Sequence, residues 1–334
     1  MKQVALGSQG LVVTSQGLGC MGMSTTYGPS DENEALATLA RALDLGVTFF
    51  DTAEAYGPFM NEALLGKAFK GKRDRVVLAT KVGFRYTGDG KLAVDAGGRP
   101  VVTGDPTLIR KAVEGSLRRL DTDVIDLVYV HRIDPHTPIE VTIDTLASLV
   151  HEGKIRYVGV SEASAATIRR AHAAHPLTAV QMEYSLFERG AERNGVLAAT
   201  RELGIGFVSY SPLGRGFLTG ELKGLDALHS TDFRRFDPRF QGVNLQANLQ
   251  LVERLGQIAA AKGVKPSQVA IAWAMSAGTV PIPGTRRIKY LEENIASSAI
   301  TLTADDLADL EQAAPFGAAA GERYSAGMMA TLGH

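Results

Sequence analysis

The chain has 334 residues, of which 45% are hydrophobic and 21% charged, and its formal net charge is -1. These values are typical of a globular protein with a sizeable core, and they offer no excess positive charge to attract nucleic acid or an anionic membrane. Cys20 is the only cysteine, which excludes an intramolecular disulfide and a multi-cysteine zinc site.

The first residues lack the apolar segment of a signal peptide, and no apolar run approaches the length of a membrane span. We therefore expect a cytoplasmic protein that acts on a small molecule, without a nucleic-acid or membrane partner and without a bound metal. An oligomer is compatible with the sequence, but no pattern indicates one. The length fits either two domains or one α/β barrel.

The chain opens with two short apolar runs, 4–6 and 11–13, around Gly7-Ser8-Gln9-Gly10, which predicts a β-hairpin. Residues 17–23 contain a literal G-x-G-x-x-G, the fingerprint of dinucleotide-binding folds. That fold needs a helix directly after the last glycine, and here residues 24–29 intervene before the next helical pattern. We therefore interpret this segment as a short strand and disfavour a Rossmann fold.

From this segment onward, apolar strands alternate with helical patterns at near-regular spacing, without a linker or a break in composition. The strands are continuous apolar runs, as expected for a parallel sheet that is buried on both faces. The predicted strands are 17–23, 47–51, 76–81, 125–131, 155–161, 179–183, 206–211 and 280–282. The predicted helices are 32–45, 62–69, 106–120, 138–151, 164–174, 192–203, 245–262, 266–276, 288–297 and 304–313.

Eight strands that are each followed by a helix predict a single (β/α)8 TIM barrel of the α/β class, over residues 1–314. The hairpin would plug one end of the barrel, and extra helices precede strand 8 and follow it. Residues 315–334 form an Ala/Gly-rich C-terminal tail, which we expect to be partly mobile.

Polar residues end three neighbouring strands of this barrel. The second strand ends at Asp51, with Tyr56 in the loop beyond it, the third ends at Lys81 and the fourth at His131. Each has an ordinary structural interpretation, such as loop capping for the aspartate or a satisfied buried histidine. Active sites of such barrels lie at the carboxyl ends of the strands, so the convergence of all four favours a catalytic site.

The chemistry of this set is that of a general acid aimed at a carbonyl group. A free tyrosine titrates near pH 10, and a neighbouring lysine ammonium lowers that pKa because it stabilises the phenolate. Asp51 can keep a buried Lys81 charged, and His131 can orient a carbonyl oxygen. No side chain here supplies a hydride, so the set predicts a nicotinamide cofactor.

Two loops of the second half offer places for cofactor phosphates. The loop after strand 7, residues 211–220, is rich in glycine and contains Arg215. The turn after strand 8 places Arg286 and Arg287 at the start of a helix, where the dipole favours an anion, so a bound phosphate would explain them. A solvated basic pair is the alternative. Tyr210 can stack on a nicotinamide ring or belong to the core.

Seven segments together resemble the aldo-keto reductase superfamily, over nearly the whole chain. The residues around Ser161 to Ser164 and the turn at 283–287 are most similar to a plant and bacterial branch that includes perakine reductase and auxin-induced-type reductases. The seven segments are 17–23, 51–57, 79–81, 126–132, 153–161, 181–185 and 210–216.

The resemblance implies an NADPH-dependent oxidoreductase that transfers a hydride to an aldehyde or ketone and binds NADP(H) without a Rossmann fold. It implies that Tyr56 is the acid, that Lys81 and Asp51 tune it and that His131 orients the carbonyl.

The resemblance also implies a set of cofactor contacts that are spread along the second half of the barrel. Ser161 and Gln181 would hold the carboxamide, Tyr210 would stack on the nicotinamide, and Ser211, Leu213 and Arg215 would line the pyrophosphate. Thr285, Arg286 and Arg287 would meet the 2′-phosphate, Glu293 and Asn294 the adenine, and Met23 and Gly284 complete the set.

Two positions depart from the family pattern. Glu162 stands where many members have an asparagine, and a carboxylate cannot donate to the carboxamide oxygen. Tyr290 stands where some branches carry a phosphate-binding arginine, which Arg286, Arg287 and Lys289 can replace.

Two other functions remain open at this stage. A regulatory NADP(H)-binding barrel, similar to the ion-channel β-subunits of the family, would turn over little. A Schiff-base aldolase would use Lys81 as its nucleophile, although Asp51 and the two arginines of the last turn argue against it. The sequence does not identify the carbonyl substrate.

Overall fold

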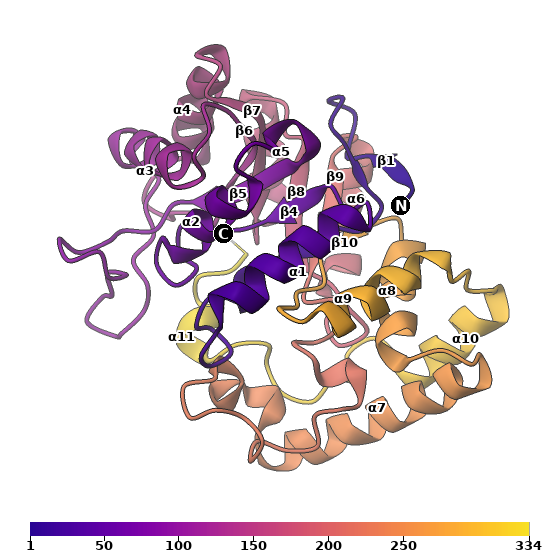
Figure 1. Cartoon of the computed structure of the whole chain (residues 1–334). Helices are drawn as coiled ribbons and strands as arrows, with labels where there is room; N and C mark the ends of the chain where they lie inside the picture. Colours follow the sequence, from indigo (N-terminus) through magenta and orange to yellow (C-terminus); the bar gives the residue numbers. More distant parts are fainter. Residues whose placement is uncertain (334) are drawn as a thin grey trace.

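The computed structural model describes residues 1–333 as a barrel of eight parallel strands surrounded by helices (Figure 1). Each strand pairs with its neighbours in sequence, in the order β10-β9-β8-β7-β6-β5-β4-β3. The two ends of the sheet meet, because the Gly17 amide donates to the Pro281 carbonyl over 2.9 Å and Gly19 forms a parallel bridge with Gly284. The single (β/α)8 barrel predicted from the sequence is confirmed.

The barrel strands are short and the helices around them longer. The strands are β3 (Leu18–Gly19), β4 (Phe49–Asp51), β5 (Val77–Val82), β6 (Ile125–Val130), β7 (Ile155–Ser161), β8 (Ala179–Glu183), β9 (Gly206–Tyr210) and β10 (Val280–Pro281). The helices are α1 (Glu32–Asp44), α2 (Met60–Phe69), α3 (Pro106–Arg119), α4 (Ile139–His151), α5 (Ala165–Ala174), α6 (Val196–Glu202), α7 (Gly242–Ala261), α8 (Pro266–Ser276), α9 (Ile288–Ala296), α10 (Ala304–Ala313) and α11 (Ala326–Met329).

Helix starts follow local capping chemistry. The Asp31 side chain accepts the Glu34 amide at the start of α1, and Asp105 caps α3 ahead of Pro106. An acidic side chain in this position satisfies an amide that has no partner within the helix, which is why these starts were predictable.

The first barrel strand is shorter than predicted, because a 3-10 turn at Met21–Met23 follows it. Gly19 of this strand has to be a glycine because a Cβ at this position would lie 2.7 Å from the Ile282 carbonyl oxygen. Gly17 and Gly19 of the G-x-G-x-x-G segment therefore belong to the closure of the barrel.

The N-terminal hairpin, β1 (Gln3–Ala5) with β2 (Val12–Thr14), plugs one end of the barrel as expected. Leu6 and Val13 are buried in a cluster with Phe49 and Leu127 from the barrel strands. In Figure 1 the hairpin lies at the upper right of the molecule, whereas α7 lies at the bottom and α11 of the tail at the left.

The C-terminal tail forms hydrogen bonds to the rest of the chain at several positions, and its partial mobility stays a prediction. Asn248 of α7 donates to the Ala320 carbonyl over 2.9 Å and accepts the Ala320 amide over 2.8 Å. The Gly333 amide donates to the Glu162 carbonyl over 2.9 Å, at the end of β7. The tail thus runs from α10 past α7 to α11 and returns to the barrel (Figure 1). Within residues 1–333 no helix is long and apolar enough to cross a membrane.

Candidate active site

Three of the four predicted catalytic side chains contact one another. Lys81 Nζ donates to Asp51 Oδ1 over 2.5 Å, to the Thr52 carbonyl over 2.8 Å and to the Tyr56 hydroxyl over 3.0 Å. Asp51 pairs with Ala79 in the β4–β5 register, and Lys81 lies two residues further along β5, so both side chains point to the same face of the sheet. Lys81 and Asp51 are 1% and 2% exposed, so water screens their attraction little.

Burial and the neighbouring opposite charges shift the pKa values of Asp51, Lys81 and Tyr56 in opposite directions. Burial raises the pKa of Asp51, and Lys81 only partly offsets it. Burial lowers the pKa of Lys81, but Asp51 outweighs that effect and the net pKa is raised. Burial raises the pKa of Tyr56 by more than Lys81 lowers it, so the expected lowering is present but does not prevail. The phenol is therefore protonated at neutral pH, as a proton donor must be.

His131, the fourth residue of the predicted catalytic set, directly follows β6. Its ring lies edge-on to the Tyr56 ring, with 6.0 Å between the centroids. Burial, reinforced by the charges of Arg132 and Lys81, holds the pKa of His131 well below 6.5, so the imidazole is neutral. Nδ1 is buried and has no hydrogen-bond partner within the described residues. A neutral imidazole carries one N–H, which can donate to a carbonyl oxygen.

The residues expected to hold the nicotinamide lie on the next three strands. Ser161 at the end of β7 is opposite Gln181 of β8, and Tyr210 ends β9. Gln181 Nε2 donates to Asp51 Oδ2 over 2.7 Å, so this amide links the nicotinamide side of the rim to the catalytic pair. The Tyr210 hydroxyl donates to Glu162 Oε1 over 2.8 Å.

The loop after β9 contains two residues other than glycine in the left-handed backbone region, Ser211 with φ 50° and Arg215 with φ 57°. Such strain in residues other than glycine often marks a functional site. Leu213 between them is buried. Arg215 is engaged by Asp237, by Glu183 at 3.2 Å and by a tail carbonyl, so a pyrophosphate would have to compete for its guanidinium. Its phosphate role stays a prediction.

The turn after β10 brings the expected 2′-phosphate residues to the start of α9. Thr285 Oγ1 accepts the Arg287 amide over 3.1 Å, and Arg286 donates to the Pro29 carbonyl over 2.6 Å. Arg287 is exposed, and its Nε lies 4.0 Å from Glu34. Gly284 precedes them where the barrel closes.

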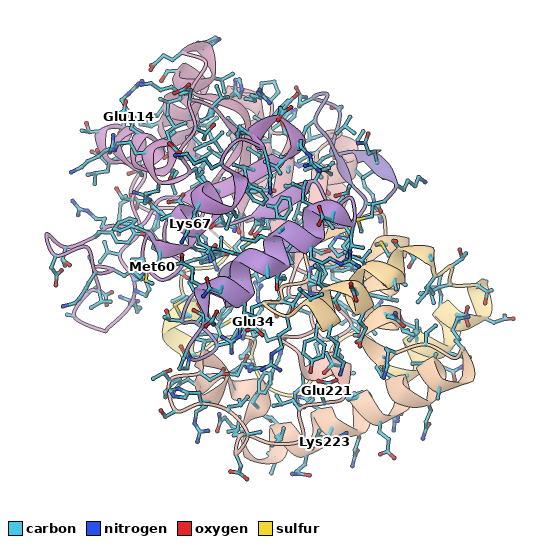
Figure 2. The ribbon with its side chains drawn as sticks, in the orientation of Figure 1. Glu34, Met60, Lys67, Glu114, Glu221 and Lys223 are labelled. Carbon is cyan, nitrogen blue, oxygen red and sulfur yellow. The ribbon has the colours of Figure 1, made fainter. Side chains whose placement is uncertain are left out.

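Two carboxylates lie on the side of the molecule where α9 begins, Glu34 on α1 and Glu221 in the segment before α7 (Figure 2). Tyr290 donates to Glu221 over 2.8 Å, so the tyrosine that departs from the family pattern pairs with an acid and not with a phosphate. The other residues predicted to contact the cofactor interact largely within the protein. Glu293 accepts a hydrogen bond from Ser267, and Asn294 and Met23 are buried.

The structure explains Glu162, which sequence reasoning left without a role. Glu162 Oε1 and Oε2 accept two hydrogen bonds from Arg323 of the tail, at 2.9 and 2.6 Å. Burial raises the pKa of Glu162, but the charge and hydrogen bonds of Arg323, the charge of Arg132 and the Glu183 amide together outweigh burial, and the net pKa is lowered. The carboxylate therefore anchors the tail at the nicotinamide side of the rim, and the Tyr324 hydroxyl lies 3.0 Å from that of Tyr210. The only signal in the sequence was the departure from asparagine, because the partner lies far away in the chain.

Comparison with known proteins identifies the class. The aldo/keto reductase family model matches residues 17–315, and the chain belongs to this family. The structure is similar to the glycerol dehydrogenase AKR11B4 from Gluconobacter oxydans, with 26% sequence identity, coverage of 93% of this chain and 94% of that one, and a TM-score of 0.83. It is also similar to the aldo-keto reductase AKR11C1 from Bacillus halodurans in its holo form, with 29% identity, 94% and 96% coverage and a TM-score of 0.77.

A third similar structure is the thermostable aldo-keto reductase Tm1743 in complex with the inhibitor epalrestat, with 27% identity, 94% and 100% coverage and a TM-score of 0.72. Family membership supports an oxidoreductase that acts on carbonyl or alcohol groups of small molecules with a nicotinamide cofactor.

Proposed function

We propose that this protein is a cytoplasmic NADPH-dependent reductase that converts an aldehyde or ketone to the alcohol, with Tyr56 as the general acid. Residues 1–314 would form its catalytic domain and residues 315–334 a tail. The observation that carries the proposal is the chain of contacts from Asp51 through Lys81 to the Tyr56 hydroxyl, beside a neutral His131.

Each side chain has a physical role in this reaction. Tyr56 donates its proton to the carbonyl oxygen, and the ammonium 3.0 Å away stabilises the phenolate that results. Asp51 keeps Lys81 charged in a buried site, and His131 holds the carbonyl oxygen in place. A bound NADPH would supply the hydride.

The residues present fit such a cofactor. Ser161, Gln181 and Tyr210 converge at the ends of three adjacent strands, where a carboxamide and a flat ring find donors and an aromatic face. Arg286 and Arg287 at the start of α9 offer positive charge and helix amides to a 2′-phosphate. These arginines favour NADPH over NADH.

Replacing Tyr56 with phenylalanine tests the proposal, because it removes only the hydroxyl. General acid catalysis contributes about 10²- to 10⁴-fold, so kcat should fall by that factor while NADPH affinity stays near wild type. The measurements are NADPH consumption with a panel of aldehydes and ketones, and titration of protein fluorescence with NADPH. A Tyr157→Phe variant, near the start of β7 and against the N-terminal hairpin, is the matched control. Undiminished turnover in Tyr56→Phe would overturn the assignment.

A further inference from the structure

Arg132 is a buried guanidinium that the catalytic roles above do not use. It follows His131 directly, and its residue surface is 6% exposed. Its one short hydrogen bond runs from Nη1 to the His131 carbonyl, at 2.7 Å. The distance from Nη1 to Ser161 Oγ is 3.5 Å, too long for a strong bond. Nε is buried and has no partner within residues 1–333.

The carboxylates near Arg132 are engaged by other arginines. Glu162 is held by two hydrogen bonds from Arg323, and Glu183 lies 3.2 Å from Arg215 and 3.1 Å from Arg239. No carboxylate oxygen of the described residues forms an ion pair with Arg132 within 4.0 Å. Within residues 1–333 Arg132 therefore has no ion-pair partner, although the charge of Glu162 is among the causes that raise its pKa.

The position of Arg132 in the chain brings its unpaired hydrogen-bond donors near the residues proposed to contact the substrate. Its sequence neighbour His131 lies edge-on to Tyr56, and these two side chains flank the place of the reacting oxygen. The Arg132 charge reaches both of them: it is among the causes that lower the pKa of His131, after burial, and it opposes the effect of burial on Tyr56. Arg132 therefore acts electrostatically on the same two side chains that would contact the reacting carbonyl.

Two kinds of acceptor could meet these donors, a neutral amide oxygen or a carboxylate. Removing a guanidinium from water is costly, and a neutral acceptor returns little of that energy, whereas a carboxylate matches the planar fork with two charge-assisted bonds. An oxidised nicotinamide would add positive charge beside Arg132, which an anionic substrate would offset. The physical chemistry therefore favours a carboxylate.

We propose that Arg132 binds the carboxylate of the substrate, and that the preferred substrates are aldehydes or ketones with a carboxylate close to the carbonyl group. The proposal rests on the proposed function. In the reaction the carbonyl π bond breaks, a C–H bond forms with the hydride from reduced nicotinamide and an O–H bond forms with the Tyr56 proton. The carboxylate is unchanged, and the product is a hydroxy acid.

A matched substrate pair tests the proposal. Phenylglyoxylate and its methyl ester have the same ketone and differ in charge. We expect the wild type to prefer the acid by at least 10-fold in kcat/KM, and Arg132→Gln to lower the ratio of acid to ester about 10- to 100-fold, mainly through KM for the acid. Arg132→Lys, which keeps the charge without the fork, should restore part of the ratio. Arg170→Gln, which removes a surface arginine paired with Glu140, should leave the ratio unchanged.

A binding measurement separates this proposal from the proposed function. Calorimetric titration of the wild type with benzoate, in the presence of NADP, should show binding that weakens at least 10-fold in Arg132→Gln. Equal binding by both proteins, or no binding by the wild type, overturns the role of Arg132. If neither phenylglyoxylate nor its ester is reduced but simple aldehydes are, the inference fails and the reductase stands. If no carbonyl compound is reduced, the reductase fails, and the benzoate titration still decides the role of Arg132.

Discussion

The catalytic group at β4 and β5 and the anchor of the tail at Glu162 are both buried and ionic, but they are assembled differently. Asp51 and Lys81 are 30 residues apart and come from neighbouring strands whose register sets the faces of their side chains. Glu162 and Arg323 are 161 residues apart and join a strand end to the tail.

The number of partners also differs between the two regions. Among the described residues Lys81 forms an ion pair with one carboxylate, that of Asp51. Arg323, the partner of Glu162, also approaches Glu183 at 3.7 Å, and Glu183 is paired in addition with Arg239 at 3.1 Å and Arg215 at 3.2 Å. A network of this kind holds loops and tail together, while a single pair tunes one proton donor. The comparison teaches that the strands place the chemistry and that the loops and tail close the site around it.

The largest effect is expected at the catalytic pair. Lys81→Met leaves the buried Asp51 without its cationic partner, so the protein should lose about 3–5 kcal/mol of unfolding free energy. It should also lose about 10²- to 10⁴-fold in kcat, because the phenolate of Tyr56 is no longer stabilised. Denaturant unfolding and steady-state kinetics measure both. The double variant Asp51→Asn/Lys81→Met should regain stability but not activity; a double variant as unstable as the single one would contradict the pairing.

A smaller effect is expected at the tail anchor. Arg323→Met removes the cationic partner of Glu162 and should cost about 2–3 kcal/mol of unfolding free energy, with faster proteolysis of the tail and a changed NADPH affinity. Glu162→Gln/Arg323→Met removes both charges and should be the less destabilised protein. Arg169→Met, at an exposed pair with Glu202, is the control and should change little. A tail that resists protease equally in all variants would show that this pair does not anchor it.

A substitution at the start of α9 should affect NADPH more than NADH. Arg287→Ser removes an exposed charge at the start of α9 and should raise KM for NADPH about 10-fold, with a much smaller effect on NADH, which lacks the 2′-phosphate. Arg41→Ser, near the same surface and paired with Glu292, serves as the control. Equal changes for the two cofactors would exclude a contact with the 2′-phosphate.

The smallest effect concerns pH and the loop of Tyr56. Burial, with a contribution from Glu62, raises the pKa of Glu54 from 4.5 to about 8. The folded protein then keeps a proton that the unfolded chain releases, so unfolding free energy should fall as the pH rises from 4.5 to about 8 and then level off. Glu54→Gln keeps an acceptor for the Gly83 amide and should flatten this slope by ~2 kcal/mol over the range. Melting curves at several pH values measure it; identical slopes would show that Glu54 is ionised in the folded state.

Much of the catalytic site was predictable from the sequence. Apolar runs that end in Asp51, Lys81 and a residue before His131 predicted the strands, and parallel strands of a barrel bring their carboxyl ends to one rim. The hydrogen bond from Gln181 to Asp51 was not predictable, because the two residues are 130 positions apart and their side chains meet only in the folded barrel.

The sequence by itself determined the barrel, its helix starts and the group of Asp51, Tyr56, Lys81 and His131, because strand periodicity and capping act over a few residues. Only the tertiary structure decided that Glu162 meets Arg323 and that Nε of Arg132 has no hydrogen-bond partner within residues 1–333. The physical reason is the same in both cases. Loops and the tail have no repeating geometry, so their side chains find partners only once the barrel has brought distant segments together.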